Sequence, residues 1–511
     1  MMHRSAVLMV QGTSSHAGKS TLVAALCRLF ARAGYRVAPF KAQNMSNNAA
    51  VTHDGREVGR AQAMQAAAAG VAVTVDMNPI LLKPQTDRTS QVVVLGRARA
   101  EHDARGYYDR TAELWPVVTG ALDRLRAEYD LVVIEGAGSP AEINLERYDI
   151  VNMRVARYAN APVLLVGDIE RGGVFASLYG TVALLPEADR ALIRGFIINK
   201  FRGDPSLLDP GFVTLLEKTG VPTLGVLPYI DLSRLPAEDA VDWDNGARKP
   251  DEQTLIDIAI MRLPRIANLD EFQPLSAEPG VRVRWISDPS ALGNPDLIIV
   301  PGTKSTMGDL AWLRERGLDV AIREHRANET PVLGICGGFQ MLGGRLIDDE
   351  GVEGAGSVEG LELLPVITHF EREKITRRVQ ARLTSHLFSS PEVDDAIDAY
   401  EIHMGRTTLE AVDDSTRRPF TVGEGDSLHP DGCASADGLV AGTYLHGLFE
   451  NAAFRRAILT GLARRKSIDL PTAPPIQSVD EAFDELADVV ARDLDLEAIG
   501  AMVGLSLAAV R

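Results

Sequence analysis

The sequence predicts an α/β protein with two or three domains built on parallel sheets. Its 511 residues exceed a single ordinary core, and 45% of them are apolar, enough to bury cores of that size. Short apolar runs alternate with helical patterns in the first half, as in sheets covered by helices on both faces. Two of the apolar runs end in glycine-rich turns, one in each half of the chain.

The first half supplies six candidate strands and a well-marked first helix. Leu22, Leu26 and Leu29 follow helical spacing after the first run, and Gly34 is a plausible helix end. The candidate strands are residues 6–10, 36–40, 130–134, 162–166, 195–199 and 222–227.

The second half resumes this alternation after a change of composition. Residues 231–253 hold many acidic and few large apolar residues, which is typical of a linker. Strand-like runs return at 255–260, 282–285, 296–300 and 331–335. We therefore expect a first domain at 1–235, a linker at 236–252, a second domain at 253–465 and a helical tail at 466–511.

Charge and cysteine content bound the possible partners. A net charge of −17 argues against a nucleic-acid partner. Three cysteines are too few for a disulfide framework and fit a reducing compartment. We see no secretory leader and no apolar run long enough to span a membrane. We expect a soluble cytoplasmic protein without a membrane partner, and an oligomer remains open.

The first glycine-rich turn, residues 11–21, has the pattern of a phosphate-binding loop. It joins a strand to a helix, so backbone N–H groups and a helix N-terminus can cradle phosphates. Lys19 would reach the β- and γ-phosphates, and the Ser20 hydroxyl would bind Mg²⁺. Five residues separate its glycines where four are usual, so the loop is a variant; a turn without ligand is the alternative. The expected ATP-binding residues are Gly12, Thr13, Gly18, Lys19, Ser20, Thr21 and Asn199.

Two later strand ends add to this site. Glu135 follows the run 130–134, and Asn199 ends the run 195–199. Ligands bind at the carboxyl ends of parallel strands, so Glu135 is a candidate Mg²⁺ ligand and Asn199 a candidate partner for a purine edge. Asp54 is a further candidate Mg²⁺ ligand.

A polar block of a different kind lies between the loop and Glu135. Amides with a few cations suit a substrate that carries carboxylates and amides, and Lys41 would stabilise charge that develops during phosphoryl transfer. Ordinary turn and cap residues are the alternative. The candidate substrate-binding residues are Lys41, Gln43, Asn44, Asn47, Asn48, Gln62 and Lys83.

The second glycine-rich turn surrounds Cys336, in Gly-Ile-Cys-Gly-Gly. An apolar run leads into it and a helical pattern follows, as in the strained strand-to-helix elbow that exposes a nucleophile. A helix N-terminus also favours the thiolate. We expect Cys336 to be a nucleophile; a buried cysteine packed as a small hydrophobe is the alternative.

A nucleophilic thiol needs a base, and histidine is the usual choice. His446 ends a strand pattern and is the first candidate, while His403 is the second and fits a substrate-binding or structural role better. Gly302 follows another strand and Gly337 follows Cys336, so their backbone N–H groups are the candidate oxyanion donors.

These motifs together resemble the cobyric acid synthase family, glutamine-dependent amidotransferases of cobalamin biosynthesis. The loop, Lys41 and the Glu-Gly-Ala-Gly at 135–138 are also similar to dethiobiotin synthetase. The Gly-Ile-Cys-Gly-Gly elbow and the Tyr-Leu-His-Gly around His446 are similar to class I glutamine amidotransferase domains. The resemblance covers nearly the whole chain. It implies a P-loop ATPase domain followed by a class I glutamine amidotransferase-like α/β domain.

One position departs from the class I pattern. Those domains usually carry a glutamate two residues after the catalytic histidine, where this chain has Leu448. The resemblance allows the departure, because the family's thiol site is described by its Cys and His, but it leaves open which group orients His446. Glu450 is a candidate with unusual spacing, and we keep it outside the predicted catalytic set.

The resemblance also implies a reaction. Cys336 would attack the side-chain amide of glutamine and release ammonia, with His446 moving the proton. ATP would phosphorylate a carboxylate of adenosylcobyrinic acid a,c-diamide, and ammonia would displace the phosphate, at the b, d, e and g carboxylates in turn. The alternatives are a cobyrinic acid a,c-diamide synthase, a different glutamine-dependent ligase, and a non-enzymatic P-loop nucleotide switch, which has no use for a cysteine elbow.

Overall fold

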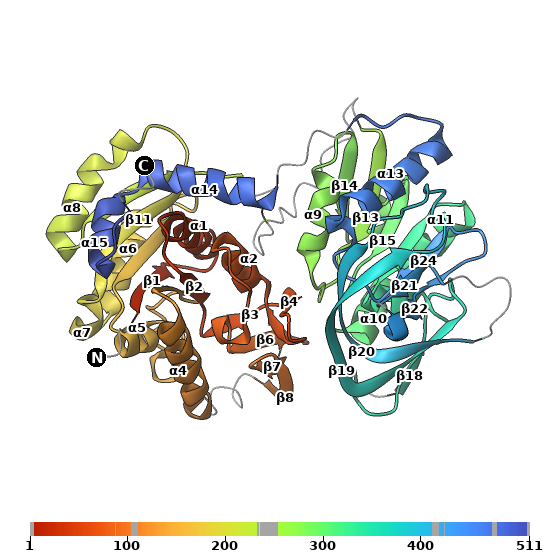
Figure 1. Cartoon of the computed structure of the whole chain (residues 1–511), viewed down its shortest axis with the longest axis horizontal. Coiled ribbons are helices and arrows are strands. Elements are labelled where there is room, and N and C mark those ends of the chain that lie inside the picture. The colour runs from red at the N-terminus through yellow and green to blue at the C-terminus, as the bar shows by residue number, and fades with distance from the viewer. Residues whose placement is uncertain are drawn as a thin grey trace.

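The chain forms two α/β bodies side by side (Figure 1). The computed structural model describes residues 5–86, 88–103, 111–231, 235, 254–354, 356–410, 418–423, 425–472 and 478–507. The expected linker at 236–252 lies outside the described residues. Each body is built on a six-stranded sheet in which parallel pairing dominates, so the predicted α/β architecture is confirmed.

The first body is organised by a parallel sheet in the order β12-β11-β10-β1-β9-β2. Each of the six candidate strands in the first half of the chain forms one of these strands. Because β1 lies between β9 and β10, the carboxyl ends of all three open at the edge where the glycine-rich loop follows β1. The strands are β1 (Ala6–Gly12), β2 (Val37–Phe40), β9 (Leu131–Glu135), β10 (Val163–Asp168), β11 (Ile193–Phe201) and β12 (Thr223–Pro228).

Helices cover both faces of this sheet, because side chains on the strands alternate between two buried clusters. One face carries α1 (Lys19–Arg32), α2 (Arg60–Ala68), α14 (Val479–Asp493) and α15 (Leu496–Val503). The other carries α4 (Thr111–Glu128), α5 (Met153–Ala159), α6 (Val174–Leu184) and α8 (Asp209–Thr219), with the short α7 (Glu187–Arg190) nearby.

The C-terminal tail returns to the first body. Helix α14 lies along α1 (Figure 1), and Arg28 Nε donates to Asp484 at 2.8 Å. A capping box formed by Ser478 and Glu481 begins α14. The tail expected at 466–511 is therefore largely a structural part of the first body. Among the described helices, none is both long and apolar enough to cross a membrane.

An insert between β2 and β9 forms the side of the first body that faces the second. Val51 and Val93 from this insert share a buried cluster with Tyr400 and Ile402 of the second body. The two bodies thus share a packed apolar contact. The insert holds a hairpin of β4 (Ala49–Val51) and β5 (Glu57–Gly59), and a sheet of β3 (Gln43–Met45), β6 (Ile80–Pro84), β7 (Thr89–Val94) and β8 (Arg97–Asp103).

The second body contains a sheet in the order β14-β13-β15-β16-β24-β23, in which only β23 runs antiparallel. Its strands are β13 (Ile256–Met261), β14 (Val281–Ile286), β15 (Leu297–Val300), β16 (Val332–Ile335), β23 (Cys433–Ala434) and β24 (Val440–Thr443). Its helices are α9 (Gln273–Ser276), α10 (Thr306–Glu315), α11 (Leu318–Ala327), α12 (Gly337–Leu342) and α13 (Ala452–Lys466).

A second, mostly antiparallel sheet lies against this core, and the sequence patterns did not indicate it. Its long hairpin of β19 (Val366–Leu383) and β20 (Ile397–Leu409) reaches toward the first body (Figure 1). The remaining strands are β17 (Arg345–Asp348), β18 (Gly356–Glu359), β21 (Phe420–Val422) and β22 (His429–Asp431).

Candidate active sites

Cys336 occupies a strained turn between β16 and α12. Its backbone has φ 52° and ψ −108°, a left-handed conformation that costs a non-glycine residue about 1–3 kcal/mol. The turn is tight: a Cβ at Gly338 would lie 1.8 Å from the Val300 carbonyl oxygen. The Cys336 N–H donates to the Thr443 carbonyl at 2.8 Å, which ties the elbow to β24. The thiol is therefore held at a fixed point, beside the N-terminus of α12.

His446 follows β24 and reaches the thiol. The imidazole lies beside the Cys336 side chain, whose thiol donates to the Ile402 carbonyl at 3.5 Å, and its ring stacks on Tyr400 with centroids 5.3 Å apart. Its Nδ1 lies 3.1 Å from Glu271 Oε1. Burial alone would lower the pKa of His446, but the carboxylate of Glu271 and the neighbouring Cys336 outweigh burial and raise it to about 10. This arrangement places a histidine where it can exchange a proton with groups at Cys336.

Glu271 is the carboxylate that the sequence patterns did not identify. It lies in a 3₁₀ turn (Leu269–Phe272), is fully buried, and its second oxygen accepts the Gly447 N–H at 3.1 Å. Leu448, the position at which class I domains carry glutamate, is buried and apolar. Glu450, the earlier candidate, instead pairs with Arg60 of the first body. An acidic residue in a connecting loop is usually solvated, so nothing in the sequence marked Glu271 as a partner of His446.

The two predicted oxyanion glycines lie beside the thiol. A Cβ at Gly302 would stand 2.8 Å from His446 Cε1 and 3.7 Å from Cys336 Cβ. Gly337 begins α12, where an N–H has no acceptor within the helix. A Cβ on Gly337 would lie 2.7 Å from Thr303 Cγ2, so the two glycine-bearing segments touch. The arrangement is compatible with the predicted role, which stays a prediction.

His403, the second candidate base, lies in the same pocket. It stacks on Tyr444 with centroids 3.8 Å apart, and its Nδ1 lies 3.1 Å from the Gly405 carbonyl oxygen. Burial lowers the pKa of His403 to about 4 despite the nearby Glu401. Because its stacking and hydrogen-bond partners are Tyr444 and Gly405, His403 suits the binding or structural role better than that of the base for Cys336.

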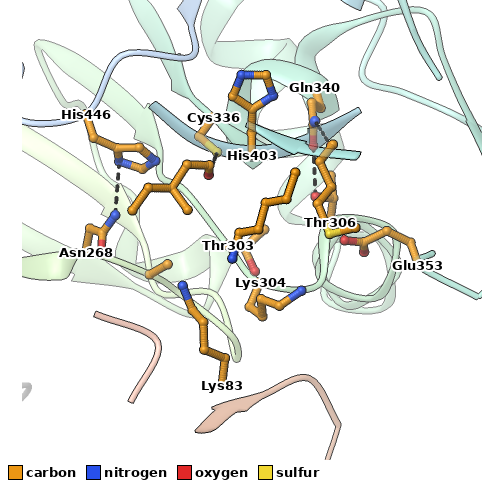
Figure 2. A pocket seen from close by; sticks show the side chains of 14 residues that line it. Lys83, Asn268, Thr303, Lys304, Thr306, Cys336, Gln340, Glu353, His403 and His446 are labelled. Carbon is orange, nitrogen blue, oxygen red and sulfur yellow. Dashed lines mark hydrogen bonds between the residues drawn. The ribbon is translucent and has the colours of Figure 1, made fainter. Parts of the chain in front are cut away.

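The pocket around Cys336 lies at the junction of the two bodies (Figure 2). Lys83, on β6 of the first body, lines it together with Lys304 and Lys374 of the second. Asn268 also lines it: its Oδ1 accepts the Ala49 N–H of the first body at 2.8 Å, and its Nδ2 lies 3.5 Å from His446 Nδ1. The thiol site is therefore composite.

The phosphate loop lies between β1 and α1 as predicted. Gly18 has φ 93°, and a Cβ there would lie 2.0 Å from Asn199 Nδ2, so only glycine fits. Asn199 Nδ2 donates to the Ala17 carbonyl at 2.9 Å, and Lys19 Nζ donates to the Ser14 and Gly138 carbonyls at 2.8 and 3.1 Å. Gly12 ends β1, the Thr13 N–H donates to the Val166 carbonyl at 2.9 Å, and Ser20 and Thr21 belong to the first turn of α1.

Glu135 gathers polar groups at the carboxyl end of β9. Ser20 Oγ donates to Glu135 Oε1 at 2.9 Å, Lys41 Nζ to the same oxygen at 2.7 Å, and Gln65 Nε2 to Oε2 at 2.5 Å. Burial would raise the pKa of Glu135, but Lys41, Gln65 and Ser20 together lower it. An ionised carboxylate and a hydroxyl are hard oxygen ligands, so these residues fit Mg²⁺ beside nucleotide phosphates.

Asp54 is placed elsewhere. It lies in the turn between β4 and β5, where its carboxylate accepts from Thr52 at 2.5 Å and pairs with Arg56 at 3.0 Å. Within the described residues, Asp54 makes no hydrogen bond or ion pair with Ser20 or Glu135. Its contacts therefore give no support to the expectation of a Mg²⁺ ligand there.

The predicted substrate block is divided among three places. Lys41 joins Glu135, and Gln43 borders a pocket next to Gly138. Asn44 and Gln62 are buried beside Gly59, whose added Cβ would meet their side chains at 2.8 and 2.7 Å. Asn47 lies on the β3–β4 connection. The other two reach the second body: Asn48 Oδ1 accepts the Leu269 N–H at 3.3 Å, and Lys83 lines the thiol pocket.

Comparison with known proteins agrees with this arrangement. Residues 8–242 match the CobQ/CobB/MinD/ParA nucleotide binding domain, and residues 257–454 match the CobB/CobQ-like glutamine amidotransferase domain. The chain is thus a glutamine amidotransferase joined to a nucleotide-binding domain.

Full-length relatives make the assignment specific. The chain is 51% identical to the cobyric acid synthase of Sorangium cellulosum over 98% of both chains. It is 50% identical to that of Desulforudis audaxviator, over 98% of this chain and 99% of the relative, and 47% identical to that of Klebsiella pneumoniae, over 97% and 98%. The chain belongs to the cobyric acid synthase family, a glutamine-dependent ligase of cobalamin biosynthesis. The family resemblance seen in the motifs is confirmed.

Proposed function

We propose that this chain amidates the b, d, e and g carboxylates of adenosylcobyrinic acid a,c-diamide, using ATP and glutamine, to give cobyric acid. The observation that carries the proposal is the presence of two complementary reaction centres in one chain. One brings Cys336, His446 and Glu271 together, and the other places the phosphate loop beside the buried pair of Glu135 and Lys41. The partners of the two centres are glutamine at the thiol centre and a corrinoid at the nucleotide centre.

At the thiol centre, Cys336 Sγ attacks the side-chain carbonyl of glutamine. His446 gives its proton to the leaving nitrogen, so ammonia departs and a thioester remains. The N–H groups of Gly302 and Gly337 stabilise the oxyanion that forms. Water then hydrolyses the thioester to glutamate, and the proton returns to His446. Glu271 keeps the imidazole oriented and favours its protonated form.

At the nucleotide centre, a substrate carboxylate oxygen attacks the γ-phosphorus of ATP and the bond to ADP breaks. Lys19 and the loop N–H groups bind the phosphates, and Lys41 stabilises the charge that develops on the transferring group. Ser20 and Glu135 are the residues that would hold Mg²⁺, which supplies charge neutralisation on the phosphates. Ammonia attacks the resulting acyl phosphate, and phosphate leaves to give the amide.

The contacts between the bodies support transfer of ammonia within one molecule. The segment that positions His446 also touches the first body: Asp270 pairs with Arg60 Nε at 2.6 Å, and Asn268 accepts from Ala49. Arg60 begins α2, the helix that carries Gln65 to Glu135. A continuous set of contacts through Arg60 and α2 therefore links the segment beside His446 to the residues around Glu135.

Product analysis tests the proposal against its nearest rival. With ATP, glutamine and the a,c-diamide, mass spectrometry is expected to show four successive losses of about one mass unit, from hydroxyl-to-amino exchange. A cobyrinic acid a,c-diamide synthase would instead convert cobyrinic acid and leave the a,c-diamide unchanged. A nucleotide switch would release no ammonia from glutamine, so that result would exclude the amidotransferase altogether.

A further inference from the structure

A buried charge cluster crosses the junction between the two bodies. Glu57 on β5 accepts Lys83 Nζ at one oxygen and Lys374 Nζ at the other, each at 2.5 Å. The side chains of Glu57, Lys83 and Lys374 are 1%, 5% and 13% exposed. Glu57 and Lys83 belong to the first body, whereas Lys374 lies on β19 of the second.

The cluster carries more positive than negative charge. Burial would raise the pKa of Glu57, but Lys374 and Lys83 lower it to about 2, so this carboxylate is ionised. The pKa of Lys374 is lowered to about 8, chiefly by burial and further by Lys83 and Lys304, against the attraction of Glu57. One carboxylate cannot neutralise two buried ammonium groups, and an unbalanced buried cation is stabilised by binding an anion.

The surplus charge faces the thiol site. Lys83 and Lys374 line the same pocket as Cys336 and His446. Figure 2 shows Lys83 and Lys304 on the side of the pocket opposite Cys336. A glutamine bound across the pocket, with its side-chain amide at Cys336, would present its α-carboxylate to this side. The carboxylate that lines the pocket, Glu353, lies beside Lys304.

We propose that Lys83 and Lys374 bind the α-carboxylate of the glutamine substrate. The inference rests on the proposed function, because it takes glutamine as the ammonia donor. Its consequence is that the synthetase body supplies part of the glutamine specificity through Lys83. Glutamine then binds fully only when the two bodies are docked.

The test compares two amides in the full-length enzyme. In L-glutaminamide the α-carboxylate is replaced by a neutral amide, and cleavage at the side chain gives isoglutamine, which mass spectrometry separates from glutamate. The wild type is expected to prefer glutamine. Lys83→Met and Lys374→Met should each lose about tenfold or more of that preference, through a higher KM for glutamine and not through kcat. Lys218→Met, at an exposed lysine on α8, should retain it.

Two further measurements make each outcome decisive. Alkylation of Cys336 by iodoacetamide, which has no carboxylate, should proceed at the wild-type rate in both variants. If alkylation slows in a methionine variant, Lys83→Arg and Lys374→Arg are tested in place of the methionine variants. An arginine variant that keeps the preference for glutamine over L-glutaminamide supports the inference, and one that loses this preference overturns it. An unchanged preference in both methionine variants also overturns it. A wild type that releases no ammonia from glutamine refutes the proposed function instead.

Discussion

Both reaction centres begin with a parallel strand that turns into a helix through a left-handed residue, but the two turns use different residues. At the phosphate loop this residue is Gly18, with φ 93°, and at the thiol elbow it is Cys336, with φ 52°. In the proposed roles, the backbone of the first turn binds phosphate, so a side chain there would only obstruct. At the second turn the side chain is the proposed nucleophile, and the strain of a non-glycine residue is accepted.

The centres also differ in where their residues come from. Lys19, Ser20, Lys41, Gln65 and Glu135 all belong to the first body. The thiol pocket takes Lys83 from the first body, and the loop that orients its histidine is held by Ala49 and Arg60. The named residues of the first centre therefore come from one domain, while those of the second come from both.

The largest expected effect separates the two centres. Cys336→Ala removes the nucleophile, so glutamine-dependent amidation should fall by roughly 10³-fold or more. Amidation with added ammonium chloride should continue at the wild-type rate, because the nucleotide centre is untouched. The measurement is product formation with each nitrogen source. Parallel loss of both activities would contradict the division into two centres.

Gly18→Ala should give the opposite pattern. The new Cβ would lie 2.0 Å from Asn199 Nδ2 at a φ that alanine avoids, so the loop must deform. We expect amidation to fall about 100-fold with either nitrogen source, because preorganised phosphate contacts are lost. Glutamine hydrolysis should persist. Gly180→Ala, on α6 with no atom within 4 Å of the added Cβ, is the matched control and should behave as wild type.

The same contrast explains what could be predicted from sequence. The loop and the elbow are each contiguous, so periodicity and glycine spacing identified them together with their strands. Glu271 could not be found from the sequence, because it is distant from His446 along the chain and contacts it only in the folded protein. The sequence places Lys83 among the candidate substrate-binding residues, yet β6 carries it into the thiol pocket. The antiparallel hairpin that brings Lys374 there also left no readable pattern.

Glu271→Gln tests the residue that sequence did not reveal. In the wild type the imidazolium is retained up to a pKa of about 10. Without the Glu271 carboxylate the pKa of His446 falls, so the alkaline limb of the glutaminase pH profile should move to lower pH. We expect kcat/KM to drop by roughly 10- to 100-fold. Among the described residues, the titratable groups beside His446 other than Glu271 are Cys336, His403 and Tyr400.

Glu450→Gln is the matched control for this change. Glu450 lies four residues beyond His446 in sequence but pairs with Arg60 and does not contact the imidazole. The alkaline limb of the glutaminase pH profile of Glu450→Gln should stay at the wild-type position. A shift of the alkaline limb in Glu450→Gln, with no shift in Glu271→Gln, would show that Glu450 and not Glu271 orients the imidazole.

The smallest predicted effect concerns the stability of the first body alone. Ser478→Ala removes the side chain that caps α14, which should cost about 1 kcal/mol. Because α14 packs on α1 through Arg28 and Asp484, the loss should appear in the unfolding of the first body. Thermal unfolding with and without ATP distinguishes that transition, since a ligand stabilises the domain that binds it. Ser478→Thr keeps a capping hydroxyl and should restore stability. Equal destabilisation of both transitions would instead show that the two bodies unfold as one unit, which would extend the interdependence of the thiol centre to the whole chain.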